Sequence, residues 1–346
     1  MDHGPVPDRR SRPTLTDLAR EAGLSPATVD RVLNNRPGVR PRTREVVLDA
    51  ARRLGYLPEG PAAPLRPVRL LFLLPAGSNA FMATLRQQIE TQSRALDGVE
   101  VRVDAIEGFD PRSLARELDA VPQGVDGIGL VALDHPLVRE AVRRLAARGI
   151  HVVTLASDVQ NVPRLAYVGI DNRQAGRLAG YVLGRFLGGR EGAEVAVFAG
   201  SRAYRGHEER EMGLRAILAE EFPGLRIVAL RESRDDRDRA HAETLALLDA
   251  HPRLAAIYNA GAGNPGIARA LAERGRTGRV LLVGHEATEA NKRLLLEGAM
   301  DAAIDQNPRV EAREALALLV AAARGGSHRL VPPRLAIVVR ENLPDD

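Results

Sequence analysis

The sequence contains no cysteine among its 346 residues, which excludes disulfide bonds, thiolate metal sites and cysteine nucleophiles. Long apolar runs are also missing, since no segment approaches the ~18 residues of a membrane span. The opening segment MDHGPVPDRRSRP has no apolar stretch of the kind that defines a secretory signal. We therefore expect a cytoplasmic protein with no membrane partner, whose polar residues 1–12 form a flexible tail.

Lysine is nearly absent, because Lys292 is the only one among 49 basic residues, and we interpret this as a bias of base composition. The basic residues that are present are unevenly distributed. Residues 1–66 hold 12 Arg against 8 Asp or Glu, whereas residues 67–346 hold 37 basic and 37 acidic side chains. All of the excess positive charge therefore lies in the first segment, where phosphates would be contacted. The length exceeds one compact core and predicts two or three domains.

The first segment has the signals of two short helices joined by a tight turn. Thr14 can cap a first helix, with Asp17 three residues later to complement the exposed amides. Gly23 can adopt the positive φ that ends this helix. Ser25 followed by Pro26 then begins a second helix. This arrangement predicts a helix-turn-helix, whose second helix enters the major groove of DNA.

Residues 14–58 closely resemble the headpiece of the lac and galactose repressor family. The family pattern T-x-x-D-[VL]-A-x-x-A-G-[VL]-S-x-x-T-V-S-R-V-[VL]-N is matched by Thr14, Asp17, Leu18, Ala19, Ala22, Gly23, Leu24, Ser25, Thr28, Val29, Arg31, Val32, Leu33 and Asn34. Its continuation is matched by Thr43, Arg44, Glu45, Val47, Gly55, Tyr56 and Pro58. Asp30 departs from the pattern, because the family usually has Ser there. The resemblance implies a sequence-specific transcriptional regulator.

We expect the second helix to read base edges. By resemblance, Pro26, Ala27 and Arg31 occupy base-reading positions, and Arg31 can donate two hydrogen bonds to a guanine. The residues better placed for phosphates or for the same helix face are Ser25, Thr28, Asn34, Arg40 and Thr43. Asp30 could accept a hydrogen bond from a cytosine amine, but we favour a structural role in which it orients Arg31 or another nearby Arg.

A linker at residues 58–67 separates this headpiece, residues 13–57, from the rest of the chain. The family has a hinge helix here that inserts a Leu into the minor groove, and Leu65 stands at that position. However, Pro58, Pro61, Pro64 and Pro67 recur every third residue, which is the period of polyproline II. We therefore expect an extended linker, with Leu65 packing on protein, and keep insertion of Leu65 into DNA as the alternative.

From residue 68 short apolar runs alternate with amphipathic helical stretches, which predicts doubly wound parallel α/β sheets. The expected strands are 68–74, 99–105, 127–132, 151–155, 166–170, 195–198, 226–230, 255–258, 280–283, 302–304 and 335–339. The expected helices are 81–95, 112–121, 136–147, 174–186, 208–221, 237–250, 265–274, 289–296 and 309–324. Eleven strands exceed one ordinary sheet and favour two lobes.

Residues 68–340 resemble a type I periplasmic sugar-binding protein. In that architecture the chain crosses between two lobes three times, and we place the crossings near 157–165, 285–290 and 307–310. The first lobe is then expected at about 68–160 and 290–306, and the second at about 161–289 and 307–340. The fold class is thus α/β, with two lobes of doubly wound parallel sheet and a small all-α helix-turn-helix headpiece.

The resemblance also implies a ligand cleft at the carboxyl ends of the strands. Asn79 and Phe81 match an N-x-F motif placed over a sugar, while Arg210, Glu286 and Gln306 match an Arg, an Asp and a crossover Gln. The further candidates at strand ends are Asp134 and Asp158, with Asn259 or Asn264 replacing a missing N-D motif. Asp134, next to His135, can equally be a turn residue.

The remaining motifs favour structural interpretations. His207, His285 and His328 lack metal-ligand spacing and are expected at the surface, and RESRDDRDRAH is expected to be a solvated loop and helix start. The Gly-rich segments GSRAYRG and GAGNPG lack the G-K-[ST] ending of a phosphate-binding loop. We therefore predict no metal and no cofactor.

We expect a transcriptional regulator, most simply a repressor, that is not an enzyme. Its expected partners are a pseudo-palindromic double-stranded operator, a second copy in a homodimer, and a sugar, polyol or sugar acid as effector. The alternatives are a small-molecule binding protein, or a sugar-converting enzyme with a helix-turn-helix appendage. No paired carboxylates or triad at suggestive spacing supports the enzyme.

Overall fold

The computed structural model describes residues 13–34, 36–54, 56 and 66–344, which form two compact units divided between Arg66 and Pro67. The first unit contains three helices, α1 (Leu15–Ala22), α2 (Pro26–Leu33) and α3 (Pro41–Arg53). The second unit, the core, contains eleven strands and nine α-helices among the described residues.

The first two helices of the first unit begin where the sequence predicts, and α1 also ends there. Thr14 and Asp17 form a reciprocal capping box at the start of α1, and Gly23 ends that helix at φ +66°. Ser25 accepts a hydrogen bond from the amide of Thr28 and so caps α2. The buried side chains that hold the three helices together are Leu18, Ala19, Val29, Val32, Val47, Ala50 and Ala51. The predicted helix-turn-helix is confirmed as a fold.

The first lobe of the core is a five-stranded parallel sheet in the order β2-β1-β3-β4-β5. Its strands are β1 (Val68–Pro75), β2 (Val99–Ile106), β3 (Gly127–Leu130), β4 (His151–Leu155) and β5 (Ala166–Val168). The run VRLLFLLP of β1 is almost entirely buried, as expected for a central parallel strand with helices on both faces. Those helices are α4 (Ala80–Ser93), α5 (Pro111–Asp119), α6 (Pro136–Ala147) and α12 (Pro308–Ala323).

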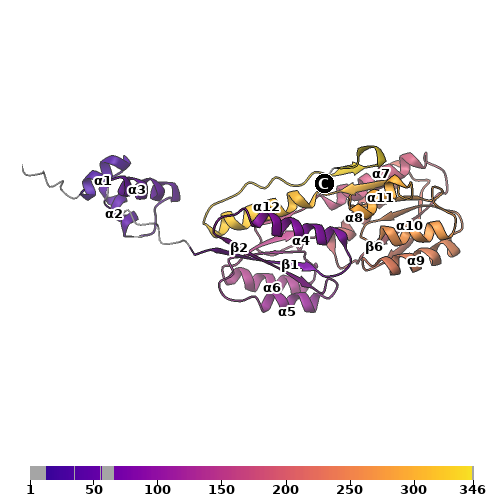
Figure 1. The fold of residues 1–346 in the computed structure, drawn as a ribbon, viewed down its shortest axis with the longest axis horizontal. Helices are drawn as coiled ribbons and strands as arrows, with labels where there is room; N and C mark the ends of the chain where they lie inside the picture. Colours follow the sequence, from indigo (N-terminus) through magenta and orange to yellow (C-terminus); the bar gives the residue numbers. More distant parts are fainter. Residues whose placement is uncertain (1–12, 35, 55, 57–65, 345–346) are drawn as a thin grey trace, which may run out of the picture. The chain divides into compact units, whose positions relative to one another are not determined.

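The second lobe is a six-stranded sheet in the order β11-β10-β9-β8-β6-β7, parallel except for the antiparallel pair β10 and β11. Its strands are β6 (Glu194–Ala199), β7 (Arg226–Glu232), β8 (Leu254–Asn259), β9 (Leu281–His285), β10 (Ala302–Asp305) and β11 (Ala336–Val338). Its helices are α7 (Asn172–Phe186), α8 (Arg205–Glu221), α9 (Arg237–Ala250), α10 (Asn264–Glu273) and α11 (Glu289–Leu296). The helix pair α7 and α8 packs in one hydrophobic cluster and α9–α11 in another (Figure 1).

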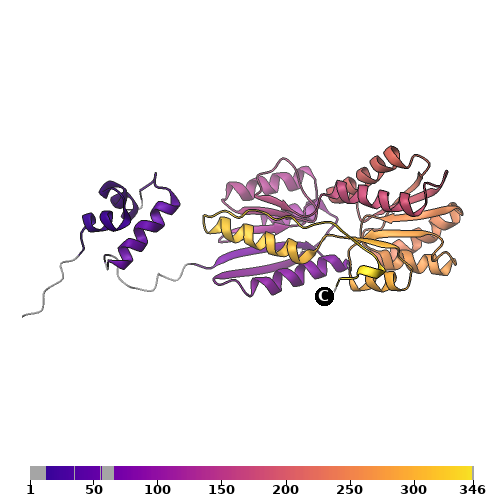
Figure 2. The same cartoon turned by 90° about the horizontal axis from the view of Figure 1, so that it is seen from above.

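The chain crosses between the lobes three times, as expected. Two of the three expected positions were wrong, and so was the expected lobe of β10 and of α12. The crossings follow β5 at 169–171, β10 at 306–307 and α12 at 324–335, rather than lying near 157–165 and 285–290. Strand β10 belongs to the second lobe, so residues 290–306 are not part of the first. Helix α12, expected in the second lobe, packs beside α4 in the first lobe (Figures 1 and 2). Its apolar face fits the uncovered side of the five-stranded sheet, which an alternating pattern alone does not reveal.

Both sheets have a switch point in strand order, between β1 and β3 and between β6 and β8. In open α/β sheets, ligands bind at the carboxyl edge near such a point, because the loops on either side diverge and leave a crevice. The segments after β1 and β6, which begin near residues 76 and 200, are therefore the expected walls of a site.

Glycines bring helices α7 and α8 unusually close together. A Cβ added at Gly176 would lie 1.8 Å from the backbone oxygen of Arg210, and one at Gly180 would lie 2.3 Å from the side chain of Ile217. In the opposite direction, a Cβ at Gly213 of α8 would lie 2.0 Å from the backbone oxygen of Arg173. The two backbones therefore touch, and this contact sets the position from which Arg210 projects.

We expect Gly176→Ala to lower the free energy of unfolding by about 1–3 kcal/mol through over-packing. This is the opposite of the gain of up to ~1 kcal/mol that alanine offers in an unobstructed helix. Urea denaturation measures the difference. The matched control is Gly326→Ala, where the nearest atom lies 3.4 Å from an added Cβ. A Gly176→Ala variant as stable as this control would show that the helices can separate without penalty.

Candidate functional site

Helix α2 exposes one face and buries the other. Pro26, Ala27 and Arg31 are exposed on it, and Asn34, its C-cap, is exposed as well. Val29 is fully buried and packs toward α1 and α3. Ser25 is exposed and Thr28 half-buried, and their hydroxyls lie 2.9 Å apart at the first turn. The surface that resembles a base-reading face is thus open, and its role in reading DNA remains a prediction.

Asp30 has partners within its own unit. Its carboxylate accepts a hydrogen bond from the Asn34 amide at 2.7 Å and lies 3.6 Å from a guanidinium nitrogen of Arg36. This geometry supports the expected structural role, with Arg36 rather than Arg31 as the arginine. Both residues of this pair are more than a third exposed, so the pair orders the end of α2 more than it stabilises the fold.

The other expected DNA contacts lie on or next to α3, or in the linker. Arg40 precedes α3 and is exposed, whereas Thr43 lies in its first turn and is half-buried. Leu65 and the rest of the segment 57–65 lie outside the described residues, so the predictions about the linker and Leu65 are not tested.

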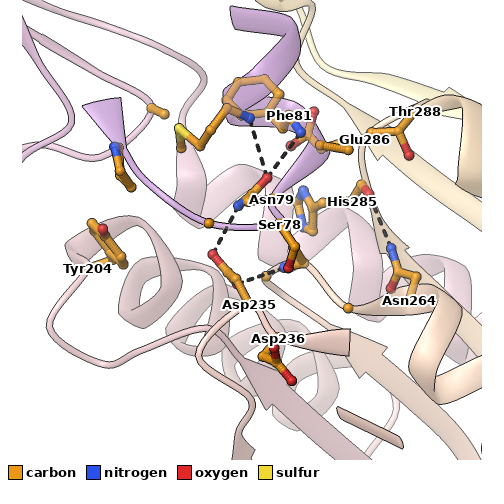
Figure 3. A pocket seen from close by; sticks show the side chains of 18 of the residues that line it. Ser78, Asn79, Phe81, Tyr204, Asp235, Asp236, Asn264, His285, Glu286 and Thr288 are labelled. Carbon is orange, nitrogen blue, oxygen red and sulfur yellow. Dashed lines mark hydrogen bonds between the residues drawn. The ribbon is translucent and has the colours of Figure 1, made fainter. Parts of the chain in front are cut away.

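A cavity of about 380 Å³ lies in the core, within the size range of small-molecule sites. Its walls come from both lobes. Residues 75–82, from the end of β1 to the start of α4, meet the segments that follow β6, β7, β8 and β9 (Figure 3). The crossover residue Gln306 lines the same cavity. Of the predicted residues, the structure brings together Asn79, Phe81, Arg210, Asn264, Glu286 and Gln306 around this cavity.

Arg210 is a fixed donor in the cavity wall. Its side chain is 5 % exposed; its Nε donates to the Asn172 amide oxygen at 2.8 Å and its Nη1 donates to the Ala260 carbonyl at 2.8 Å. These contacts use two of the five guanidinium N–H groups and hold the plane in one orientation. The remaining donors suit the lone pairs of vicinal hydroxyls or of a carboxylate.

Glu286 and Gln306 line the cavity together and form what we call its polar floor. The Gln306 Nε2 donates to Glu286 Oε1 at 2.5 Å, while Glu286 Oε2 and Gln306 Oε1 are buried with no hydrogen-bond partner among the described residues. Glu286 also has a left-handed backbone, with φ +72°. Burial and the charge of Asp305 raise the pKa of Glu286 to about 8, against the opposing effect of Arg210. At neutral pH, Glu286 therefore carries a proton, so its Oε2 is an unpaired donor, while Gln306 Oε1 is an unpaired acceptor. Buried polar atoms without partners are costly, and a ligand hydroxyl that pairs with them would recover that cost.

The expectation that His285 lies at the surface was wrong. It is 2 % exposed, lines the cavity, and its Nε2 lies 2.8 Å from the hydroxyl of Tyr258. Burial and the nearby Arg210 lower the pKa of His285 well below its ordinary value, so the ring is neutral at pH 7. His207 also lines the cavity. His285 is buried because it ends β9, whereas His207 lies in the first turn of α8 and is half-buried. Spacing rules for metal ligands do not consider either position.

Asn79 and Phe81 line the cavity, but their side chains already make contacts within the protein. The Asn79 side-chain oxygen caps α4 by accepting from the Phe81 amide at 3.0 Å, and its nitrogen donates to Asp235 of the second lobe at 3.0 Å (Figure 3). Phe81 is 5 % exposed and packs in the first lobe's hydrophobic core. The Asn79–Asp235 contact therefore joins the two lobes directly.

Asp134, Asp158 and Asn259 were expected at the ligand, but none of them lines the cavity. Asp134 pairs with Arg139 at 2.6 Å and reaches Arg205 of the second lobe at 3.5 Å. Asp158 is paired with a single arginine, Arg164, through both carboxylate oxygens. Each carboxylate lies beside an arginine from a neighbouring helix or loop, and such pairings cannot be read from strand ends.

Asn259 is fully buried behind the cavity, where it donates to the side-chain oxygen of Asn264 at 2.7 Å. Asn264 lines the cavity itself. Of the two candidates for the missing N-D motif, Asn264 faces the cavity, and Asn259 orients the Asn264 side chain from behind it.

Sequence reasoning missed the segment after β7. Arg234 and Asp235 line the cavity with left-handed backbones, at φ +52° and +56°, although RESRDDRDRAH was expected to be solvated. Arg234 lies over the ring of Phe109 at 5.3 Å, and Tyr204 packs edge-on against the same ring while donating to the Gly108 carbonyl. The strand-end rule, applied to β7 as to its neighbours, would have found this segment.

No group of three or more His, Asp or Glu side chains that could hold a metal ion occurs within the described residues. None of the helices they form is long and apolar enough to cross a membrane.

Comparisons with known proteins match both units. Residues 70–327 match the periplasmic binding protein domain, and residues 14–59 match the bacterial regulatory proteins of the lacI family. The D-allose-binding periplasmic protein of Escherichia coli is 27% identical over 259 residues, 72% of this chain and 82% of that protein. Catabolite control protein A of Priestia megaterium is 32% identical over 165 residues, 47% of this chain and 48% of that protein.

Among solved structures, the core is similar in fold to GanP, a glucose-galactose binding protein from Geobacillus stearothermophilus. The TM-score is 0.74 at 24% identity, over 80% of this chain and 99% of that one. This agreement supports the two-lobed fold of the core.

The raised pKa of Glu286 has a consequence for stability. Glu286 keeps its proton in the folded protein, whereas the unfolded chain releases this proton above about pH 4.5. The contribution of Glu286 to the free energy of unfolding is therefore fully present below about pH 4.5 and is lost as the pH rises through about 8. The slope is at most ~1.4 kcal/mol per pH unit.

Glu286→Gln keeps the neutral shape and cannot ionise. We therefore expect the free energy of unfolding of this variant, relative to the parent protein, to rise by about 2–4 kcal/mol between pH 5 and pH 8. Urea denaturation at matched ionic strength measures it, with the exposed Glu297→Gln as control. Parallel pH profiles for the variant and the parent would contradict a buried, protonated Glu286.

Proposed function

Because the chain belongs to the periplasmic binding protein domain family and carries a lacI-family regulatory domain, we propose that it is a DNA-binding transcriptional regulator controlled by a sugar-like effector. The observation that carries this proposal is the cavity of the core. Residues 75–82 of the first lobe and Arg210, Glu286 and Gln306 line it together. A ligand that contacts all of them holds the lobes in one relative position, and this is the state that a regulator can report to its DNA-binding unit.

We propose a sugar, polyol or sugar acid as the effector. The fixed guanidinium of Arg210 offers donors, and the floor formed by Glu286 and Gln306 offers an unpaired carboxyl O–H and an unpaired amide oxygen. A hydroxyl both accepts and donates, so neighbouring hydroxyls match this arrangement. The names of two relatives, a D-allose-binding and a glucose-galactose binding protein, support the same chemical class.

We further propose that the protein acts as a repressor, in the cytoplasm where its operator lies, and binds as a homodimer to a pseudo-palindrome. One three-helix headpiece buries too little surface for tight specific binding, and two headpieces on symmetric half-sites supply the rest. A role as a sugar-binding protein of the transport type would leave residues 14–59 without a purpose.

A thermal-shift screen tests the effector class. The panel contains D-allose, D-ribose, D-glucose, D-galactose, sorbitol, myo-inositol and D-gluconate. A ligand present at 100 times its dissociation constant adds about 2.7 kcal/mol to stability. A panel member that binds and also changes operator affinity supports the proposal. Binding without any change in operator affinity would favour a binding protein instead, and recovery of a chemically altered sugar would favour an enzyme.

For DNA reading, we expect Arg31→Ala to weaken operator binding by about 1–3 kcal/mol and to relax the preference at one base pair, because it removes a bidentate donor. Binding to operators varied at one position at a time measures both effects. Arg20→Ala on α1, which is also exposed, is the control and should leave the base preference unchanged. An unaltered profile for Arg31→Ala would remove this residue from base reading.

For the effector site, we expect Arg210→Ala to abolish the change in operator affinity caused by the panel sugar. Operator affinity without sugar should stay within about threefold of the parent protein, since Arg210 lies in the core. Fluorescence anisotropy with labelled operator measures both values. Arg215→Ala on the exposed side of the same helix is the control. Loss of both affinities together would indicate a folding defect.

A further inference from the structure

A chain of hydrogen bonds leads from the last strand of the first lobe to Arg210. Asn172 Nδ2 donates to the Tyr167 hydroxyl at 2.9 Å, and Asn172 Oδ1 accepts from Arg210 Nε at 2.8 Å. The Tyr167 hydroxyl in turn lies 3.2 Å from the carbonyl oxygen of Ala156 and 3.1 Å from that of Ile170. Arg210 ends the chain at the Ala260 carbonyl in the second lobe.

The two linking residues lie on opposite sides of a crossing between the lobes. Tyr167 belongs to β5, in the sheet of the first lobe, and Asn172 is the first residue of α7 in the second. The three residues 169–171 form the crossing between them. A change of backbone torsion angles within 169–171 that rotates the lobes also changes the distance from the Tyr167 hydroxyl to the Asn172 amide, whereas Asn172 and Arg210 move together on packed helices.

The site is built for this contact. A Cβ at Gly169 would lie 2.3 Å from the Tyr167 hydroxyl oxygen, so the crossing can pass the hydroxyl only as glycine. Asn172 is 2 % exposed, and a Cβ at Gly206 would lie 3.2 Å from its side-chain nitrogen. Burial raises the pKa of Tyr167, so the hydroxyl keeps its proton and the contact does not depend on pH.

The Asn172 amide has one orientation that serves both neighbours. Its nitrogen must face the hydroxyl, because its oxygen must accept from a guanidinium that has donors and no acceptor. A lobe rotation that withdraws the Tyr167 hydroxyl leaves the buried Asn172 amide nitrogen without an acceptor. The Asn172 amide can then reorient only by weakening the hydrogen bond that its oxygen accepts from Arg210.

We propose that Tyr167 and Asn172 are positioning residues that make the direction of the Arg210 guanidinium depend on the angle between the lobes. The inference rests on the proposed function of Arg210 as an effector contact. Because coupling is reciprocal, an effector held by Arg210 would favour the lobe angle at which this hydrogen-bond chain is intact. Neither linking residue lines the cavity, so their influence on the effector passes through Arg210.

The first experiment needs no effector. The absence of native cysteine allows spin labels at two introduced cysteines, Ala95→Cys in the first lobe and Ala246→Cys in the second, both at exposed positions. Mixing with excess unlabelled protein leaves at most one labelled chain in each oligomer. Double electron–electron resonance then gives the distribution of distances between the lobes for the parent, for Tyr167→Phe, for Asn172→Ala and for the double variant.

We expect Tyr167→Phe and Asn172→Ala each to shift or broaden this distribution, and the double variant to match Asn172→Ala, because both changes break one chain. Tyr181→Phe, which removes a hydroxyl from the exposed side of α7, is the matched control and should leave the distribution unchanged. A parent-like distribution for Tyr167→Phe, or additive effects of the two changes, would overturn the proposal. Thermal melting checks that each variant is folded.

The second experiment uses the panel sugar with the largest thermal shift. We expect Tyr167→Phe to weaken its binding about fivefold to tenfold, as for one lost buried hydrogen bond, and to reduce the sugar-induced change in interlobe distance. Unchanged affinity together with an unchanged distance response would also overturn the proposal. Failure of every sugar to bind the parent protein would count against the proposed effector class, while the ligand-free experiment would still decide the role of Tyr167 and Asn172.

Discussion

Glycine on one helix face lets α7 and α8 approach until their backbones touch, and the geometry of the cavity depends on this contact. Gly176 lies against the backbone of Arg210, so the guanidinium projects from a point that cannot drift. Asn172, at the start of α7, is then close enough to orient the same guanidinium. A larger side chain at Gly176 would push the Arg210 backbone away and so displace the Arg210 guanidinium from the cavity, although no polar side chain had been altered.

The second constraint is the unpaired polar floor opposite that donor. A folded protein rarely leaves buried acceptors without partners, since each costs about 1–3 kcal/mol. Glu286 and Gln306 hold unpaired buried polar atoms at the end of adjacent strands, an amide oxygen of Gln306 and the carboxyl O–H of Glu286, which burial keeps protonated at neutral pH. The core therefore maintains a strained polar surface that a hydroxyl-rich ligand would relieve, while contacts such as Asn79–Asp235 already join the lobes.

Much of the secondary structure could be predicted because its signals are local. Capping residues such as Thr14 and Ser25, and buried runs such as that of β1, determine their elements within a few residues. The residues of the candidate site that match motifs at strand ends, such as Arg210, were found for the same reason. Asp134 and Asp158 were not predicted correctly. They carry suitable carboxylates, yet Arg139 and Arg164, only five and six residues along the chain, pair with them away from the cavity, and a position at a strand end does not reveal such a pairing.

The sequence by itself determined the two-unit organisation, the helix-turn-helix, the alternation of strands and helices, and the residue types available at strand ends. Tertiary structure alone decided which lobe receives β10 and α12, which histidines are buried, and how Tyr167 of one lobe meets Asn172 of the other. The division has one physical cause. Local backbone preferences and periodicity act over a few residues, whereas burial and side-chain pairing depend on which surfaces meet when segments far apart in the chain pack together.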